Sequence, residues 1–149
     1  MTIADFPQFD SNGDLPAGVH RAVLSAVLSH FGSGQSQRRI VAHRLDRIYR
    51  LARSTGHLAR FVIFGSFITS KPNPNDVDLF LIMDNEFEVG EVTGEAAVIF
   101  DHGAAQNYEG ASIFWIRRMA AIGGEDEAVK YWQIKRDGKE RGIVEVVEP

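Results

Sequence analysis

The sequence contains no cysteine among its 149 residues, which excludes a disulfide framework and a thiolate metal site. Long apolar runs are missing as well, because no stretch approaches the roughly 20 residues that cross a bilayer. The first residues, Met1 to Pro7, lack the basic and apolar regions of a signal peptide. From these absences we expect a cytoplasmic protein without a membrane span.

Charge of one sign is not in large excess either. Sixteen lysines and arginines face twenty acids, and the formal net charge is −4. This balance argues against a general nucleic-acid coat protein, although it leaves a local basic patch open. Hydrophobic residues make up 44% of the chain and charged residues 24%. We therefore expect one folded domain over residues 1–149.

The apolar periodicity predicts an α/β (α+β) domain. It indicates a helix over about 17–31, with Pro16 in its first turn, and a second helix over about 36–55. The buried face of the second helix is formed by residues at 4-3-4 spacing, which are Val41, Leu45, Ile48 and Ala52. A short mixed sheet with helices on one side is the expected architecture.

Strands are predicted where apolar residues cluster between turn residues. The expected strands are 61–64, 76–83 and 111–116, followed by a C-terminal β-hairpin of 131–136 and 142–147 that turns at Asp137-Gly138. Gly123 and Gly124, with the acids after them, are expected to form a loop.

Two short motifs carry most of the chemical information. Gly65-Ser66 follows an apolar strand, and Asp76-Val77-Asp78 opens the next one after a polar, proline-rich loop. Two carboxylates at i and i+2 of a strand point the same way, with alpha carbons roughly 6.6 Å apart, so both can reach one Mg²⁺. A glycine lets the backbone approach a phosphate, and the Ser66 amide and hydroxyl can donate to phosphate oxygens. Lys71, in the loop between the motifs, can neutralise triphosphate charge.

Each motif alone has a simpler interpretation. Strand entrances often carry solvated acids, and the Pro-Asn-Pro-Asn stretch before Asp76 is typical of an Asx-rich turn. The joint order of strand, Gly-Ser, short loop, Asp-x-Asp and strand favours the functional interpretation.

These motifs resemble the signature of the polymerase-beta-type nucleotidyltransferase superfamily. The chain looks closest to its minimal bacterial and archaeal members, several of which pair with HEPN proteins in toxin–antitoxin modules. Three stretches, residues 9–20, 64–79 and 142–146, are also similar to a family of small uncharacterised bacterial and phage proteins within that superfamily. The resemblance covers nearly the whole chain.

The resemblance implies a polymerase-beta-like nucleotidyltransferase fold, and it also implies cofactors and roles for the motif residues. Gly65 and Ser66 would hold the triphosphate, and Asp76 and Asp78 would hold Mg²⁺ or Mn²⁺. The implied reaction moves a nucleotidyl group from a nucleoside triphosphate such as ATP to a hydroxyl of a protein or RNA. The implied partner is a HEPN-type toxin or an RNA acceptor, within a toxin–antitoxin or phage-defence module.

Members of the superfamily usually carry a third carboxylate on the next core strand, and this element of the pattern is missing here. Residues 111–116 contain no acid, and Ser112 stands where one is expected. Glu109 and Asp101 lie nearby, although we interpret Glu109 as a solvated loop acid and Asp101 as a helix N-cap. His102 suits proton transfer, but a surface or cap role is commoner for such a residue. A catalytically degenerate protein that binds nucleotide or neutralises a partner is therefore the alternative function.

The predicted second helix carries six arginines, which are Arg38, Arg39, Arg44, Arg47, Arg50 and Arg53. They could meet RNA or an acidic partner, but a solvated helix face is the commoner explanation. The aromatic residues Phe114, Trp115, Tyr131 and Trp132 are expected to fill the core or cover the sheet.

Overall fold

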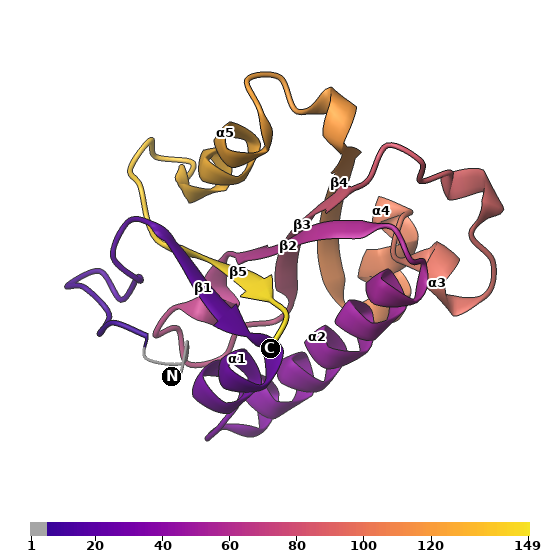
Figure 1. Ribbon diagram of the computed structural model, residues 1–149. Helices are drawn as coiled ribbons and strands as arrows, with labels where there is room; N and C mark the ends of the chain where they lie inside the picture. Colours follow the sequence, from indigo (N-terminus) through magenta and orange to yellow (C-terminus); the bar gives the residue numbers. More distant parts are fainter. Residues whose placement is uncertain (1–5) are drawn as a thin grey trace.

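A computed structural model describes residues 6–149 as five strands and several helices around one sheet (Figure 1). The strands are β1 (Val19–Val23), β2 (Leu58–Phe64), β3 (Val77–Met83), β4 (Ala111–Arg117) and β5 (Ile143–Val147). The α-helices are α1 (Leu24–Phe31), α2 (Ser36–Ser54), α3 (Glu95–Val98), α4 (His102–Ala104) and α5 (Glu125–Lys130). Short 3₁₀ turns are η1 (Ser66–Ile68), η2 (Val89–Glu91), η4 (Arg118–Ala120) and η5 (Tyr131–Gln133), and η3 (Ala105–Glu109) is a π-helical turn.

The sheet is mixed, in the order β1-β5-β2-β3-β4. β5 runs parallel to β1 and antiparallel to β2, β2 is antiparallel to β3, and β3 is parallel to β4. The mixed α/β architecture that the sequence predicts is thus confirmed. In the part of the chain that the structure describes, no helix combines the length and apolar character needed to cross a membrane.

Alternation along β3 builds two hydrophobic layers. Val77, Leu79, Leu81 and Met83 belong to the large cluster that also contains the buried face of α2. Phe80 and Ile82 point to the other face and pack with Val129 of α5. The predicted arrangement with helices on one side of the sheet is wrong, because α5 covers the second face (Figure 1).

α2 forms as its sequence predicts. Val41, Leu45, Ile48 and Ala52 are fully buried, as the 4-3-4 spacing requires. The helix ends at Ser54, and Gly56 follows with a φ of +76°. A left-handed glycine just beyond the last turn is the usual way in which a helix of this length stops.

The predicted helix over 17–31 is wrong in its first half. Residues Val19 to Val23 form β1, which pairs along its whole length with β5, and the helix starts only at Leu24. Ala22 is fully buried in this strand. Pairing with a partner more than a hundred residues away outweighs the local pattern, and the sequence around β1 does not reveal that partner.

The predicted C-terminal hairpin is also wrong. Ile134 and Glu140 form a single isolated bridge, and β5 instead enters the sheet between β1 and β2. Ile143 and Val144 are fully buried, which suits an interior strand. The predicted loop after Gly124 is helix α5, whose first turn holds three acids where the helix dipole favours negative charge.

Candidate functional site

The two sequence motifs meet at one end of the sheet. Gly65 follows β2 directly, with φ +84° and ψ −166°, and Phe64 at the end of β2 pairs with Asp78 of β3. A Cβ on Gly65 would overlap the Asp78 carboxylate, whose Cγ would lie 2.9 Å away. The carboxylate therefore lies directly against bare backbone, and only glycine fits at this position.

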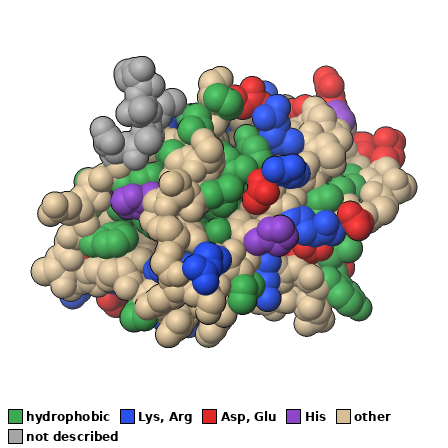
Figure 2. Space-filling model, turned by 90° about the horizontal axis from the view of Figure 1, so that it is seen from below, with side chains coloured by type: hydrophobic (Ala, Val, Ile, Leu, Met, Phe, Trp, Pro, Cys, Tyr) green, Lys and Arg blue, Asp and Glu red, His purple; other side chains and the backbone are tan. Residues whose placement is uncertain are grey.

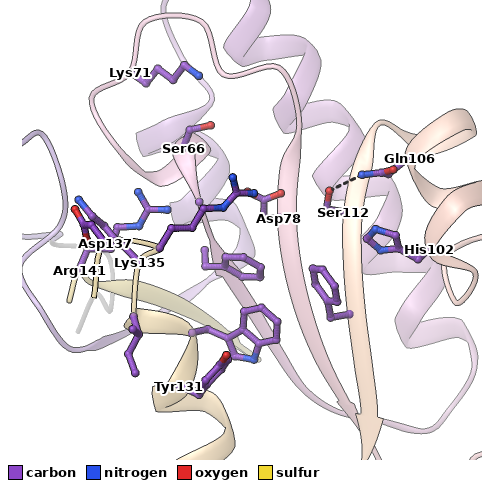
Figure 3. Close-up of a pocket in the computed structure, with 16 residues that line it drawn as sticks. Ser66, Lys71, Asp78, His102, Gln106, Ser112, Tyr131, Lys135, Asp137 and Arg141 are labelled. Atoms are coloured by element: carbon purple, nitrogen blue, oxygen red, sulfur yellow. Dashed lines mark hydrogen bonds between the residues drawn. The ribbon is translucent and has the colours of Figure 1, made fainter. Parts of the chain in front are cut away.

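This contact opens onto a pocket of about 900 Å³ (Figure 3). Its lining residues come from the end of β2, from β3 and β4, from the segment around α4 and η3, and from the 131–141 segment. Four of the five predicted site residues line it, namely Gly65, Ser66, Lys71 and Asp78. Asp76 does not line the pocket, although its charge acts on Asp78.

Positive charge dominates the pocket wall. Lys71 is joined there by Lys135, Arg136 and Arg141, while Asp78 and Asp137 are the acids of the wall. The three additional cations come from the 131–141 segment, and the sequence pattern does not indicate their place in the pocket because it predicts a hairpin there. A surplus of cations around a pocket favours a polyanionic ligand.

A buried carboxylate outside the pocket holds two of these cations. Asp14, 6% exposed, lies 3.2 Å from the Lys135 ammonium and 3.6 Å from an Arg141 guanidinium nitrogen. Gln133 also accepts a hydrogen bond from the Gly18 amide at 2.6 Å. The residues between Asp14 and Gly18 thus tie the 131–141 segment to the rest of the fold.

Asp78 is electrostatically unusual. Burial raises its pKa to about 6, and the negative charge of Asp76 contributes in the same direction. Arg141, a hydrogen bond from Ser112 and Arg136 oppose this rise in pKa only partly. Near neutral pH the protein therefore keeps a carboxylate whose charge is poorly compensated, and a cation bound beside it would remove that cost.

Aromatic rings form the floor of the pocket. Trp132 lies 4.5 Å from Phe64 and 5.1 Å from Phe114 between ring centroids, and His102 lies 4.9 Å from Phe114. Phe114 is 41% exposed and Tyr131 is 63% exposed, so both present open ring surface at the rim. The prediction that Trp132 covers the sheet is confirmed, since it packs with the second hydrophobic cluster.

The two acids that precede β4 in the chain, Asp101 and Glu109, do not line the pocket. Glu109 is 8% exposed and accepts two hydrogen bonds from Arg47, at 2.9 and 3.4 Å, so the expectation of a solvated loop acid is wrong. Asp101 accepts from the Ala104 amide at 2.9 Å, which confirms its predicted role as an N-cap. Neither acid lines the pocket.

Ser112 occupies the place beside Asp78. The two residues are register partners in the β3–β4 pair, and the Ser112 hydroxyl acts to lower the pKa of Asp78. Gln106 donates to the same hydroxyl at 3.1 Å, as Figure 3 shows. His102 lines the pocket next to them, and one of its ring nitrogens lies 3.3 Å from the Ile113 carbonyl oxygen.

The arginines of α2 are engaged within the molecule. Arg47, Arg50 and Arg53 pair with Glu109, Asp46 and Glu148, respectively. Arg38 and Arg39 donate to backbone carbonyls. Figure 2, a view from below, shows Lys and Arg side chains interspersed with Asp and Glu. These contacts favour an interpretation of the helix as a structural support.

A family model described as "Family of unknown function (DUF6932)" matches residues 7–147. A search of curated proteins and a search of solved structures found no match.

The raised pKa of Asp78 predicts a pH-dependent effect of Asp78→Asn on stability. The folded protein holds the Asp78 proton up to about pH 6, whereas the unfolded chain releases it near 3.8. The contribution of Asp78 to the free energy of unfolding is largest below pH 3.8 and is lost as the pH rises through 6. The reason is that between these values the folded state binds a proton that the unfolded chain has released. The neutral asparagine escapes this loss, so the variant should gain about 1–3 kcal/mol over wild type at about pH 7.5 and little at about pH 4.

Urea unfolding of both proteins at the two pH values measures this difference. Asp137→Asn is the matched control, because the pKa of Asp137 is lowered by the Lys139 backbone amide and the variant should gain nothing. An Asp78→Asn protein that is less stable than wild type at the higher pH would contradict the assignment.

Gly65→Ala should destabilise the fold by about 2–4 kcal/mol, because alanine is strained at this φ and its Cβ displaces the Asp78 carboxylate. Gly138→Ala is the control, since Gly138 has the same φ of +84° with open space around it. Chemical denaturation of each variant measures the loss. In an Asp78→Ala background the cost of Gly65→Ala should shrink, and an unchanged cost in that double-mutant cycle would show that the two residues do not interact.

Proposed function

The chain belongs to the family of unknown function DUF6932, and for it we propose a nucleotidyltransferase of the polymerase-beta type. It would bind a nucleoside triphosphate with Mg²⁺ or Mn²⁺ and move the nucleotidyl group to a hydroxyl of a protein or RNA. Pyrophosphate would be the second product.

The observation that carries this proposal is the contact between Gly65 and Asp78 inside a cationic pocket. The contact places a carboxylate of high pKa beside a turn without a side chain. Four cations surround this point. An anion that binds at the turn would bring its oxygens next to the carboxylate, and a divalent metal ion held by Asp78 would offset the repulsion between the two negative groups.

The residues present fit a magnesium or manganese ion. Asp78 and Asp76 supply oxygen ligands from positions i and i+2, and Asp76 is near enough for its charge to raise the Asp78 pKa. Within residues 6–149, no group of three or more acidic or histidine side chains is placed to hold an ion. Phosphate oxygens would therefore complete the coordination, which agrees with the way Mg²⁺ enters nucleotide sites. The ion would supply electrostatic stabilisation of the phosphate that is attacked.

Side chains and backbone groups of the pocket would bind the phosphates and the base. The Ser66 amide and hydroxyl would donate to the terminal phosphates, and Lys71, Lys135 and Arg141 would neutralise them. The base would stack on the exposed face of Phe114 or Tyr131.

In the transfer itself, the acceptor oxygen forms a bond to the α-phosphorus and the bridging bond to the β-phosphate breaks. The hydroxyl proton would pass to solvent, because the pocket is open and, among residues 6–149, no group of three acidic or histidine side chains gathers around Asp78.

A second function has an observation of its own. Ser112, rather than an acid, is the register partner of Asp78, and Glu109 is engaged by Arg47. A pocket of this kind can bind nucleotide without transferring it. The protein would then act as a nucleotide sensor, or would neutralise a partner such as a HEPN-type toxin by contact.

Incubation with labelled ATP, CTP, GTP and UTP, Mg²⁺ or Mn²⁺ and lysate distinguishes the two functions. We expect label to appear on a protein or RNA with wild type and to fall at least about a hundredfold in the Asp76→Ala/Asp78→Ala variant, because the metal ligands are lost. Asp84→Ala is a matched control, since this aspartate follows β3 but pairs with His57, away from the pocket. Nucleotide binding in calorimetry without any transfer would contradict the enzyme and favour the sensor.

A further inference from the structure

Arg38 makes the most concentrated set of hydrogen bonds to backbone in the part of the chain described here. One of its terminal nitrogens donates to the Phe31 and Phe67 carbonyls at 3.1 and 2.7 Å. The other donates to the Thr69 and Lys71 carbonyls, both at 2.6 Å. All four terminal N–H groups of the guanidinium are thus used, and three of the four acceptors lie in the loop that follows Gly65.

These bonds set the orientation of the loop's peptide groups. Arg38 does not line the pocket, whereas Ser66 and Lys71 do, so the loop lies between Arg38 and the pocket. The carbonyls of Phe67, Thr69 and Lys71 turn toward the guanidinium. A carbonyl oxygen repels phosphate, and collecting these oxygens on the far side leaves the pocket side of the loop to donors and to the Lys71 ammonium.

The loop is also tied on its other flank. The Ser70 amide donates to the Gly13 carbonyl at 2.9 Å, and Thr69 closes the turn by donating twice to the Ser66 carbonyl, from its amide at 3.1 Å and from its hydroxyl at 2.7 Å. Phe67 and Ile68 are buried beneath it. Without Arg38, three loop carbonyls would lose their partner while the other ties remained, so the loop would loosen locally and the sheet would keep its fold.

We infer that Arg38 is a positioning residue that shapes the 66–71 loop for the phosphates of a magnesium-bound triphosphate. The inference rests on the proposed function for its ligand and on the hydrogen bonds for its geometry. Arg38, the first arginine of α2, would thus shape the wall of the pocket without lining it, rather than serve as a solvated surface residue.

The positive charge of Arg38 is a second contribution to phosphate binding, and it can be separated from the hydrogen bonds by the choice of variant. Among residues 6–149 no carboxylate pairs with Arg38, so the loop rests on an unneutralised cation. Lysine keeps this cation but has three N–H groups on one nitrogen and cannot span four carbonyls. Arg38→Lys therefore tests shape, and Arg38→Gln removes the charge as well. Arg50→Lys is the control, because Arg50 is on the same helix, 76% exposed and paired with Asp46.

Two measurements on the full chain test the inference. Calorimetry with Mg²⁺ and tripolyphosphate, and with Mg²⁺ and each of the four nucleoside triphosphates, gives the affinity. Arg38→Lys should bind on the order of tenfold more weakly, since hydrogen bonds to a charged group that shape the loop are lost, while Arg50→Lys should match wild type. Hydrogen exchange gives the order of the loop, and the amides of Thr69 and Ser70 should exchange faster in Arg38→Lys while those of β3 keep their wild-type rates.

The results for Arg38→Lys and for wild type distinguish the positioning role of Arg38 from triphosphate binding itself. Wild-type affinity and wild-type loop exchange in Arg38→Lys would overturn the positioning role even if nucleotide binds. Faster exchange across β3 as well would overturn it in favour of a general structural role. If wild type binds no triphosphate, the proposed function and the phosphate-positioning role both fail, and exchange confined to residues 66–71 would leave Arg38 as a support of the loop alone.

Discussion

The contact of the Asp78 carboxylate with the bare backbone of Gly65 is the constraint on which the site depends. β2 and β3 must pair in one register for the two residues to meet, and that register is fixed by the buried alternation of β3. Glycine is required because a side chain would overlap the carboxylate. The same closeness buries Asp78 and raises its pKa, so the local geometry and the electrostatics of the site have one cause.

The two walls of the pocket are held from outside it. Arg38 holds the loop after Gly65 by hydrogen bonds to its carbonyls, and Asp14 pairs with Lys135 and Arg141 of the 131–141 segment. Cations in the pocket and a carboxylate of raised pKa are each unfavourable in isolation. A triphosphate with a divalent ion would relieve both at once, and this is the reason for proposing that ligand rather than a simple anion.

The apolar periodicity of the sequence predicts the helix and the two strands that follow one another in the middle of the chain. α2, β2 and β3 follow their periodicity, and Gly65 and Asp78 meet as the order of motifs suggests. The errors concern long-range pairing, since β1 and β5 are parallel neighbours that no local signal links. The same error hid Lys135, Arg136 and Arg141, which enter the pocket only because β5 lies inside the sheet. The sequence shows that Arg38 belongs to a basic helix, but its four carbonyl partners come together only in the tertiary structure.

The proposed role of Asp78 is to hold a divalent ion together with a triphosphate. Water-proton relaxation of Mn²⁺, titrated with the protein in the presence and absence of each nucleoside triphosphate, measures this role. We expect weak Mn²⁺ binding to the protein alone and a ternary complex with at least one triphosphate that Asp78→Asn abolishes. Mn²⁺ bound equally with and without nucleotide, or a ternary complex that survives in Asp78→Asn, would be evidence against this role.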